Sequence, residues 1–214
     1  MKIVKQSVKL EQPISGLDIL RRIEAAGRTC YQSEALDSLP YAFVERLIRR
    51  GHESVLEHVS ISVRVVTDRG VSHEIVRHRI GCSYSQESTR YCAYGAGISV
   101  VFPAGLSDEN AKRWTTAVQV AEKAYTSMLQ SGCSAQLARS VLPTCVKTEL
   151  VITMNLRSWR HFFKLRCAPA AHPQMRELAS MILDLFRKEI PIVFDDVTNP
   201  PYIRPVADGT AVAI

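Results

Sequence analysis

The sequence predicts an α+β domain in which a mixed β-sheet packs against long helices. Residues 59–65 read Val-Ser-Ile-Ser-Val-Arg-Val, the strict alternation of a strand with one buried face. Residues 107–132 instead carry apolar side chains at helical spacing. Strand and helix patterns do not follow the regular rhythm of a doubly wound parallel sheet, and this irregular order favours the α+β class.

The N-terminal part of the chain predicts one strand and two helices. Residues 3–10 alternate and indicate a strand, whereas apolar residues within 14–31 recur at helical spacing. A second helix is expected over 40–50, because Gly51 can end it in a left-handed conformation.

The middle of the chain adds short elements and one long helix. A short helix is expected over 69–77, after the alternating strand, and a short strand over 98–103. Ser107 is a favourable N-cap for the long helix, which should end at Gly132.

The C-terminal part predicts three helices around one more strand. The helices are expected over 135–140, 155–165 and 172–190, and the strand over 146–154. No repeat, low-complexity stretch or linker divides the chain, so a single domain over 1–214 is expected.

Composition favours a globular protein of the cytoplasm with no membrane partner. Apolar residues make up 46% and charged residues 22%, and no apolar run approaches the roughly 20 residues that span a bilayer. The alternating N-terminus does not resemble a signal peptide. The six cysteines form no CxxC pair, which argues against a zinc ribbon or a disulfide framework and predicts buried free thiols.

The net charge of +6 predicts anionic partners. The arginines occur inside mixed polar motifs rather than in a lysine-rich block, and a planar guanidinium suits bidentate phosphate recognition. This distribution favours small phosphorylated ligands over nucleic acid. No glycine-rich phosphate-binding loop is present, so side chains and helix ends would have to hold such a ligand.

Four segments concentrate polar side chains beyond the needs of a core, namely residues 51–58, 73–91, 138–143 and 155–166. The first carries two His and two Glu, but its spacing is not that of a zinc-hydrolase motif, so no metal site is expected. The alternative is a polar corner that bonds to its own backbone. In the third segment, Arg139 is expected on the last turn of a short helix, where a cation meets the helix dipole favourably.

The second segment contains Arg77, His78 and Arg79 in succession, followed by a run of donors from Ser83 to Arg90. The three consecutive side chains point in different directions and could reach a pyrophosphate and a ring edge together. A solvated surface does not explain a stretch this polar with so little lysine.

The fourth segment separates into two sets on its expected helix. Arg157 and His161 are i,i+4 neighbours on one face, whereas Trp159, Phe162 and Phe163 point largely elsewhere. Burial explains the aromatic set, but packing does not explain the polar one.

In this order the four segments resemble the flavin-dependent thymidylate synthases, from the Ala25–Tyr31 motif to Arg176 and so over most of the chain. The signature of that family is RHR, seven residues and then serine. Here the RHR stands between GHESVLEH upstream and the NLRSWRHFFKLR helix downstream, a combination that is hard to obtain by chance.

The resemblance implies a homotetramer with active sites shared between subunits. It implies FAD, reduced by NADPH, methylenetetrahydrofolate as the carbon donor and dUMP as the methyl acceptor. The positions that match flavin contacts are Ser54, Arg77, His78, Arg79, Asn155, Leu156, Arg157 and His161. The positions that match nucleotide contacts are Glu74, Arg77, Gln86, Glu87, Ser88, Thr89, Arg90, Arg139 and Arg166.

Arg166 matches the arginine to which the family assigns ionisation of the uracil ring at N3, and it is the expected catalytic residue. A permanently charged guanidinium stabilises the anion that remains when N3 loses its proton. An enzymic thiol nucleophile is not needed, and a packed thiol is the favoured interpretation of Cys82.

Three departures from the family pattern keep a related activity open. Eight residues, not seven, separate Arg79 from Ser88, and the stretch between Arg166 and His172 is longer than usual. Glu74 stands where glutamine is often found, and a carboxylate there needs a donor partner. Flavin-dependent hydroxymethylation of dUMP is therefore the alternative within the family.

Two rival classes remain to be tested. A basic nucleic-acid-binding protein could use Trp159, Arg160, Phe163 and Lys164 as a stacking surface. A metal hydrolase could be built on the six histidines.

Overall fold

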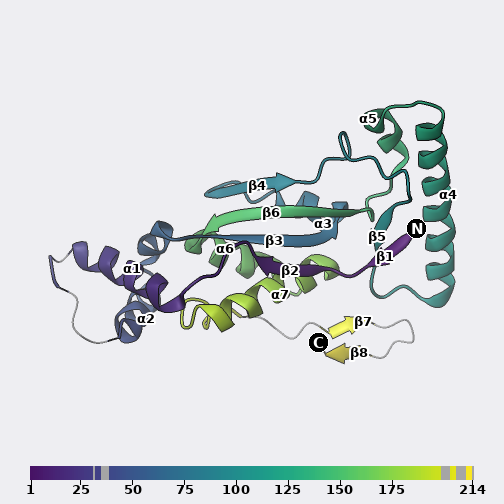
Figure 1. Cartoon of the computed structure of the whole chain (residues 1–214). Coiled ribbons are helices and arrows are strands. Elements are labelled where there is room, and N and C mark those ends of the chain that lie inside the picture. The colour runs from purple at the N-terminus through teal and green to yellow at the C-terminus, as the bar shows by residue number, and fades with distance from the viewer. Residues whose placement is uncertain (31, 35–38, 199–202, 206–210, 214) are drawn as a thin grey trace.

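The computed structural model describes residues 1–30, 32–34, 39–198, 203–205 and 211–213. A four-stranded antiparallel sheet in the order β2-β3-β6-β4 occupies the centre of the molecule (Figure 1). Its strands are β2 (Ser7–Leu10), β3 (Ser60–Asp68), β6 (Lys147–Asn155) and β4 (Cys82–Gln86). The combination of this sheet with long helices confirms the α+β prediction.

The register of β3 and β6 gives the sheet one apolar face. Val63 lies opposite Ile152, and both side chains are fully buried. Their sequence neighbours point to the other face, where Ser62 and Thr153 are hydrogen-bonded through their hydroxyl groups at 2.7 Å. The strict alternation in the sequence reflects this division between a buried and a polar face.

The apolar face is covered by α3 (Arg69–Ile75), α6 (Leu156–Arg166) and α7 (Pro173–Glu189). At one end of the sheet lie α1 (Gly16–Thr29), α2 (Tyr41–Arg49) and the 3-10 helix η1 (Glu53–His58), on the left of Figure 1. The predicted aromatic set on α6 forms the centre of this core, because Trp159, Phe162 and Phe163 are all fully buried.

A second apolar cluster lies at the opposite end, beside α4 (Asp108–Gln130). It includes residues of α5 (Ala135–Ala138), the 3-10 helix η2 (Arg139–Val141) and β5 (Ser99–Val101). The strand β1 (Lys2–Val4) pairs parallel with β5. The buried members of the cluster are Ile98, Val100, Val118, Tyr125, Ala138 and Val146. Because Val146 directly precedes β6, the central strand connects this cluster to the main core.

The predicted cap at Ser107 and the predicted helix ends at Gly51 and Gly132 are confirmed, whereas the helices predicted over 69–77 and 135–140 end earlier, at Ile75 and Ala138. The Ser107 hydroxyl accepts a hydrogen bond from the Asn110 amide, and Gly51 and Gly132 take left-handed conformations at φ +73° and +87°. Tyr31, the predicted end of the first helix, lies outside the described residues. The short strands β7 (Ile203–Pro205) and β8 (Ala211–Ala213) pair antiparallel and were not predicted.

The prediction of a single strand over 3–10 is wrong, because this segment forms β1 and β2 in two different sheets. Gln6 lies at the break, and its buried amide oxygen accepts a hydrogen bond of 2.6 Å from the Thr67 hydroxyl. The Gln6 amide nitrogen donates to the carbonyl of Gln174 at 3.1 Å. These core bonds hold the side chain inward at the point where the chain leaves one sheet for the other.

No strand was predicted in the run of donors from Ser83 to Arg90, but its first part lies in β4. Ser83 and Ser85 are exposed, while the intervening Tyr84 is half-buried and donates a hydrogen bond to the carbonyl of Ile75 at 3.1 Å. The strand exists because it pairs along β6, a long-range contact that small polar side chains do not signal in the sequence.

The cysteine prediction is only partly correct. All six thiols are free, yet only Cys167 is buried, and Cys30 and Cys92 are exposed. Within the described part of the chain, no helix is both long enough and apolar enough to cross a membrane.

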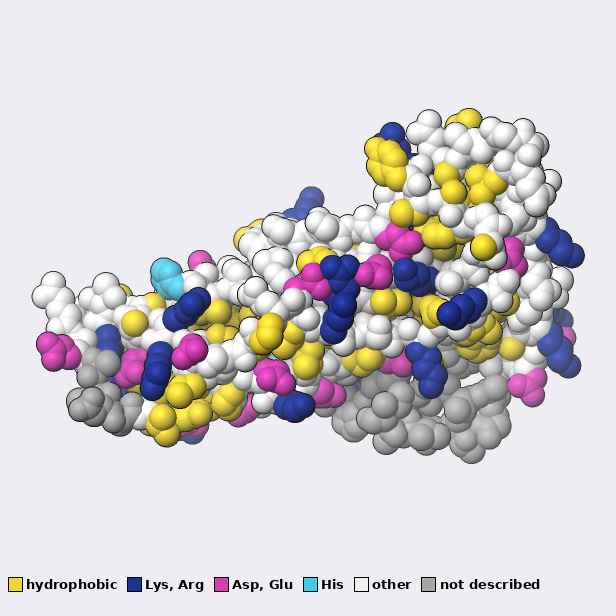
Figure 2. Space-filling view, in the orientation of Figure 1, with side chains coloured by type: hydrophobic (Ala, Val, Ile, Leu, Met, Phe, Trp, Pro, Cys, Tyr) yellow, Lys and Arg dark blue, Asp and Glu magenta, His cyan; other side chains and the backbone are white. Residues whose placement is uncertain are grey.

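Basic and acidic side chains are intermixed on the side of the molecule shown in Figure 2. Arg64 pairs with Glu11 at 2.7 Å and with Glu149 at 2.6 Å, and Lys147 pairs with Glu87 at 2.8 Å. The positive net charge therefore does not form a single-sign surface on this side.

The two faces of the sheet give a matched pair of stability predictions. Ile152→Ala should lower the free energy of unfolding by about 2–5 kcal/mol, because it leaves a cavity against α6 and α7. Val151→Ala, the neighbouring change on the polar face, should cost less than about 1 kcal/mol. Denaturant titration of both variants measures this difference, and equal losses would contradict the assigned burial.

Candidate active site

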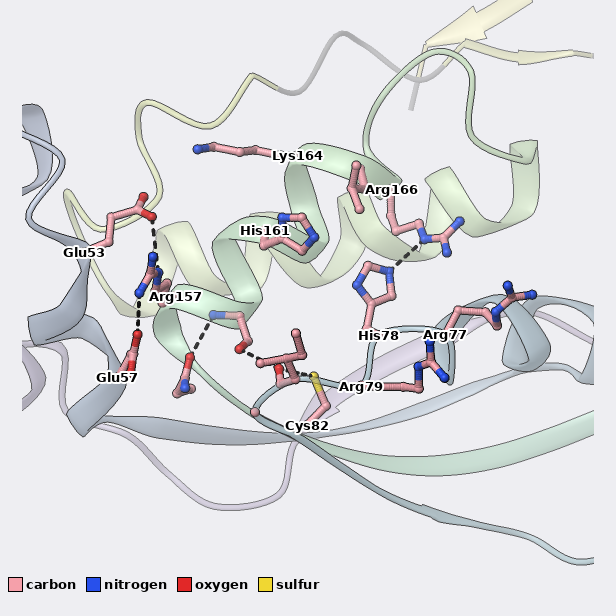
Figure 3. A pocket seen from close by; sticks show the side chains of 15 residues that line it. Glu53, Glu57, Arg77, His78, Arg79, Cys82, Arg157, His161, Lys164 and Arg166 are labelled. Carbon is pink, nitrogen blue, oxygen red and sulfur yellow. Dashed lines mark hydrogen bonds and ion pairs between the residues drawn. The ribbon is translucent and has the colours of Figure 1, made fainter.

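A cavity of about 820 Å³ lies between α6, the segment 77–82 and η1 (Figure 3). Its volume is within the usual range for a small-molecule or cofactor site. It is lined by Glu53, Glu57, Arg77, His78, Arg79, Ile80, Gly81, Cys82, Asn155, Arg157, Ser158, His161, Lys164, Leu165 and Arg166.

The cavity brings together most of the residues that were matched to flavin contacts. The lining residues among them are Arg77, His78, Arg79, Asn155, Arg157 and His161. Arg166, matched to catalysis, also lines it. Ser54 is exposed on η1 outside the lining, and Leu156 is fully buried in the core, so Leu156 could meet a ligand only through its main chain.

At a tight turn around Gly81, the segment that contains Arg77, His78 and Arg79 packs against the start of α6. Gly81 has φ +67°, and a Cβ there would lie 2.8 Å from the Ser158 hydroxyl oxygen. The Ser158 hydroxyl donates to the carbonyl of Ile80 at 3.1 Å, and the Ser158 amide donates to the Asn155 side chain, which caps α6, at 2.8 Å. A side chain at position 81 would therefore separate the two halves of the cavity wall.

Two carboxylates on η1 hold Arg157 at one end of the cavity. The Arg157 guanidinium donates to Glu57 at 2.6 Å and lies 3.8 Å from Glu53. Glu53 also accepts a 3.1 Å bond from Arg160, whose nearly fully buried guanidinium forms a bidentate pair with Asp196 at 2.6 and 2.7 Å. Glu53 thus links the solvent-facing Arg157 to the buried guanidinium of Arg160.

At the other end, Arg166 lies against His78. The Nε of Arg166 donates to the Nε2 of His78 at 2.9 Å. Burial is the main cause that lowers the pKa of His78 to about 4, and the charge of Arg166 and the nearby His161 contribute to the same shift. His78 is therefore neutral near pH 7, and because its Nε2 accepts a bond, its proton lies on Nδ1.

Three cationic side chains that line the cavity make no hydrogen bond or ion pair with any described residue: those of Arg77, Arg79 and Lys164. The two carboxylates of the lining both face Arg157. The cavity therefore carries uncompensated positive charge and suits an anionic ligand.

Of the residues that were matched to nucleotide contacts, Arg77 and Arg166 line the cavity and Glu74 bonds to Arg166. The others, Gln86, Glu87, Ser88, Thr89, Arg90 and Arg139, form a second group at the far end of β4. The Gln86 amide donates to Ser72 and Thr148, each at 3.0 Å. Glu87 accepts from Tyr94 at 2.7 Å and from Lys147 at 2.8 Å.

The rest of this group surrounds Thr89. Its buried hydroxyl accepts a 3.4 Å bond from Arg139, the Ser88 hydroxyl accepts from the Arg90 amide at 3.3 Å, and Arg90 lies over the Tyr91 ring at 5.3 Å. Arg139 begins η2 and does not lie on the last turn of the preceding helix, which corrects the expected placement. None of the residues 86–90 lines the cavity, and neither does Arg139.

The sequence interpretation did not place Glu53, Glu57, Ser158 and Lys164 in a flavin or nucleotide site, although they also line the cavity. A signal for Lys164 was present, because positions 157, 161 and 164 recur on one helical face. Glu53 and Glu57 lie within the polar segment 51–58, but their pairing with α6 is a tertiary contact that local spacing does not reveal.

The structure contradicts the proposed stacking surface for nucleic acid. Trp159 and Phe163 are fully buried and Arg160 is 3% exposed, so these side chains cannot receive a base. The thiol of Cys82 is half-buried, and burial raises its pKa, which lowers the thiolate fraction that a nucleophile needs. Among the described residues, no group of three or more His, Cys, Asp or Glu could hold a metal ion.

Comparison with known proteins gives consistent matches over most of the chain. The family model described as thymidylate synthase complementing protein matches residues 15–192. The flavin-dependent thymidylate synthase of Geobacter sulfurreducens is 37% identical over 199 residues, which covers 87% of this chain and 85% of the relative. The enzyme of the same name from Mycolicibacterium gilvum is 37% identical over 213 residues, covering 89% and 83%.

A solved structure of a UMP/dUMP methylase, PolB from Streptomyces cacaoi bound with 5-Br dUMP, has the same fold. Its TM-score is 0.74 at 24% sequence identity, and the match covers 94% of this chain and 100% of that one. The match to the family model and the identity to the curated relatives together show that this chain belongs to the thymidylate synthase complementing protein family, that of the flavin-dependent thymidylate synthases.

Proposed function

We propose that this chain is a single-domain enzyme that reductively methylates dUMP to dTMP, with methylenetetrahydrofolate as the carbon donor and NADPH-reduced FAD as the hydride source. The observation that carries the proposal is the cavity in which unpaired arginines, a neutral histidine and Arg166 meet. Membership of the family and the names of the curated relatives support the flavin and the reaction.

The cavity fits a flavin dinucleotide in charge and construction. A diphosphate would meet Arg77 and Arg79, whose guanidinium groups have no described protein partner. Arg157 and His161, one turn apart on α6, would contact the same cofactor from the opposite wall. The reduced flavin supplies hydride, while these side chains bind and orient it.

The second group would bind the nucleotide phosphate. Arg90 and Arg139 offer charge-assisted hydrogen bonds, each worth roughly 1.5–3 kcal/mol, and Ser88 adds a hydroxyl donor. The strand β4 separates this group from the RHR segment in the same chain by about 17 Å. A homotetramer in which one subunit's second group completes another's cavity would bring the two together, as the family resemblance implies.

Arg166 would act on the uracil ring. Its guanidinium would stabilise the anion formed when N3 is deprotonated, because a guanidinium is a cation that can bond to the ring edge. The neutral His78 accepts a bond from Arg166 without adding a second positive charge beside it.

The product of turnover tests the reaction. We expect anaerobic incubation with dUMP, methylenetetrahydrofolate, FAD and NADPH to yield a nucleotide heavier by one methyl group, measured by mass spectrometry. A hydroxymethyl nucleotide would instead support the related hydroxymethylase. No change in any pyrimidine monophosphate would contradict both activities.

Removal of Arg157 tests the cofactor site. Arg157→Ala should weaken FAD binding by at least about tenfold, because it removes a cation and leaves the Glu57 carboxylate facing the cofactor. The matched control is Arg49→Ala, which removes a largely exposed arginine from a surface pair with Glu45. Flavin fluorescence titration should show the control within about twofold of the unaltered chain. Equal affinity in both variants would place the flavin elsewhere.

A further inference from the structure

The guanidinium of Arg166 donates three hydrogen bonds to two residues of another segment, His78 and Glu74. Besides the bond from its Nε to His78, its Nη1 donates to the Glu74 carboxylate at 2.9 Å. Its Nη2 donates to the main-chain carbonyl of Glu74 at 3.1 Å. Arg166 ends α6, whereas Glu74 lies in the last turn of α3, so these bonds tie the ends of two helices together.

Glu74 itself stands behind Arg166 and not at the cavity wall. Arg166 and His78 both line the cavity, while Glu74 does not. A guanidinium has five N–H groups, and three of those on Arg166 are used in these bonds. One N–H on each terminal nitrogen is therefore left for a ligand.

We propose that Glu74 is a positioning residue that fixes the guanidinium of Arg166 in the cavity, and that it acts on the substrate only through Arg166. The expected effect on kcat rests on the proposed function. The expected effect on the position of Arg166 does not. Arg166 is also the donor partner that the carboxylate at position 74 needs.

The physical need for such a residue follows from the length of the arginine side chain. A long side chain at a helix end has many rotamers, and fixing them costs free energy that partners must offset. The carboxylate supplies a charge-assisted bond, and the carbonyl near the C-terminal end of α3 adds the favourable contact of a cation with that end. Misplacement of a reacting group by about 1 Å can cost 100-fold in rate, so this orientation matters for catalysis.

The negative charge of Glu74 also offsets the positive charge of Arg166, which lies beside the His78 ring. With the carboxylate in place, Arg166 forms a charge pair whose outer N–H groups stay available. The side chains that face the His78 imidazole are those of Arg166, His161 and Phe162. The pKa of His78 therefore depends on where the charge of Arg166 lies.

Glu74→Ala and Glu74→Gln separate positioning from other roles. In Glu74→Ala the guanidinium loses its main anchor, so we expect kcat to fall at least tenfold while FAD affinity is unchanged. In Glu74→Gln the amide oxygen can accept the same bond, so kcat should stay within threefold. Glu109→Ala, which breaks an exposed arginine pair on α4, is the matched control and should have no effect.

A second readout does not depend on turnover. Titration of His78 by NMR in the full-length chain should give a pKa of about 4 in the unaltered protein. In Glu74→Ala this pKa should rise towards the ordinary value, because the charge of Arg166 moves away, and in Glu74→Gln it should not.

Two results would overturn the proposal. One is a Glu74→Ala variant whose His78 pKa and kcat are both unchanged. The other is a raised KM for dUMP with unchanged kcat in both variants, which would mean that Glu74 contacts the nucleotide directly. Absence of turnover in the unaltered chain would remove the proposed function, and the His78 titration would still decide whether Glu74 positions Arg166.

Discussion

The antiparallel register between β4 and β6 decides where the cavity forms. Cys82 lies opposite Met154, so the RHR segment that precedes β4 and the helix α6 that follows β6 leave the sheet at the same end. The register of β3 adds Ser60 opposite Asn155, which brings the preceding η1 to this end as well. Three segments far apart in sequence thus supply one cavity through strand pairing alone.

Two arginines on α6 differ in burial: Arg160 lies in the core, and Arg157 lines the cavity. Arg160 is almost completely buried and fully paired, because an unpaired guanidinium in the core would be costly. Arg157, three residues earlier, is 52% exposed by its side chain and meets carboxylates only on one side. The helical period places one on the core side and the other at the cavity, although their sequence contexts are similar.

Sequence patterns predicted most helices and the two long strands, since each has its own periodicity or cap. They did not predict β4 or the division of residues 3–10, because these depend on pairing partners that are distant in sequence. Among the residues that line the cavity, Arg77, His78 and Arg157 were predicted from the family motifs. Glu53 and Glu57 were not assigned, because their role follows from a packing contact between η1 and α6.

The register between β4 and β6 brings the cavity residues together at one end of β4, and it places the second polar group at the other end. Gln86 pairs with Leu150 at the other end of β4, and Arg139 lies on the segment that leads into β6 at that end. Because β4 is paired along its whole length with β6, it cannot fold back to join the two groups. If both bind one substrate, as we propose, a second copy of the chain must supply one of them, so that assembly becomes a condition of catalysis and not only of stability.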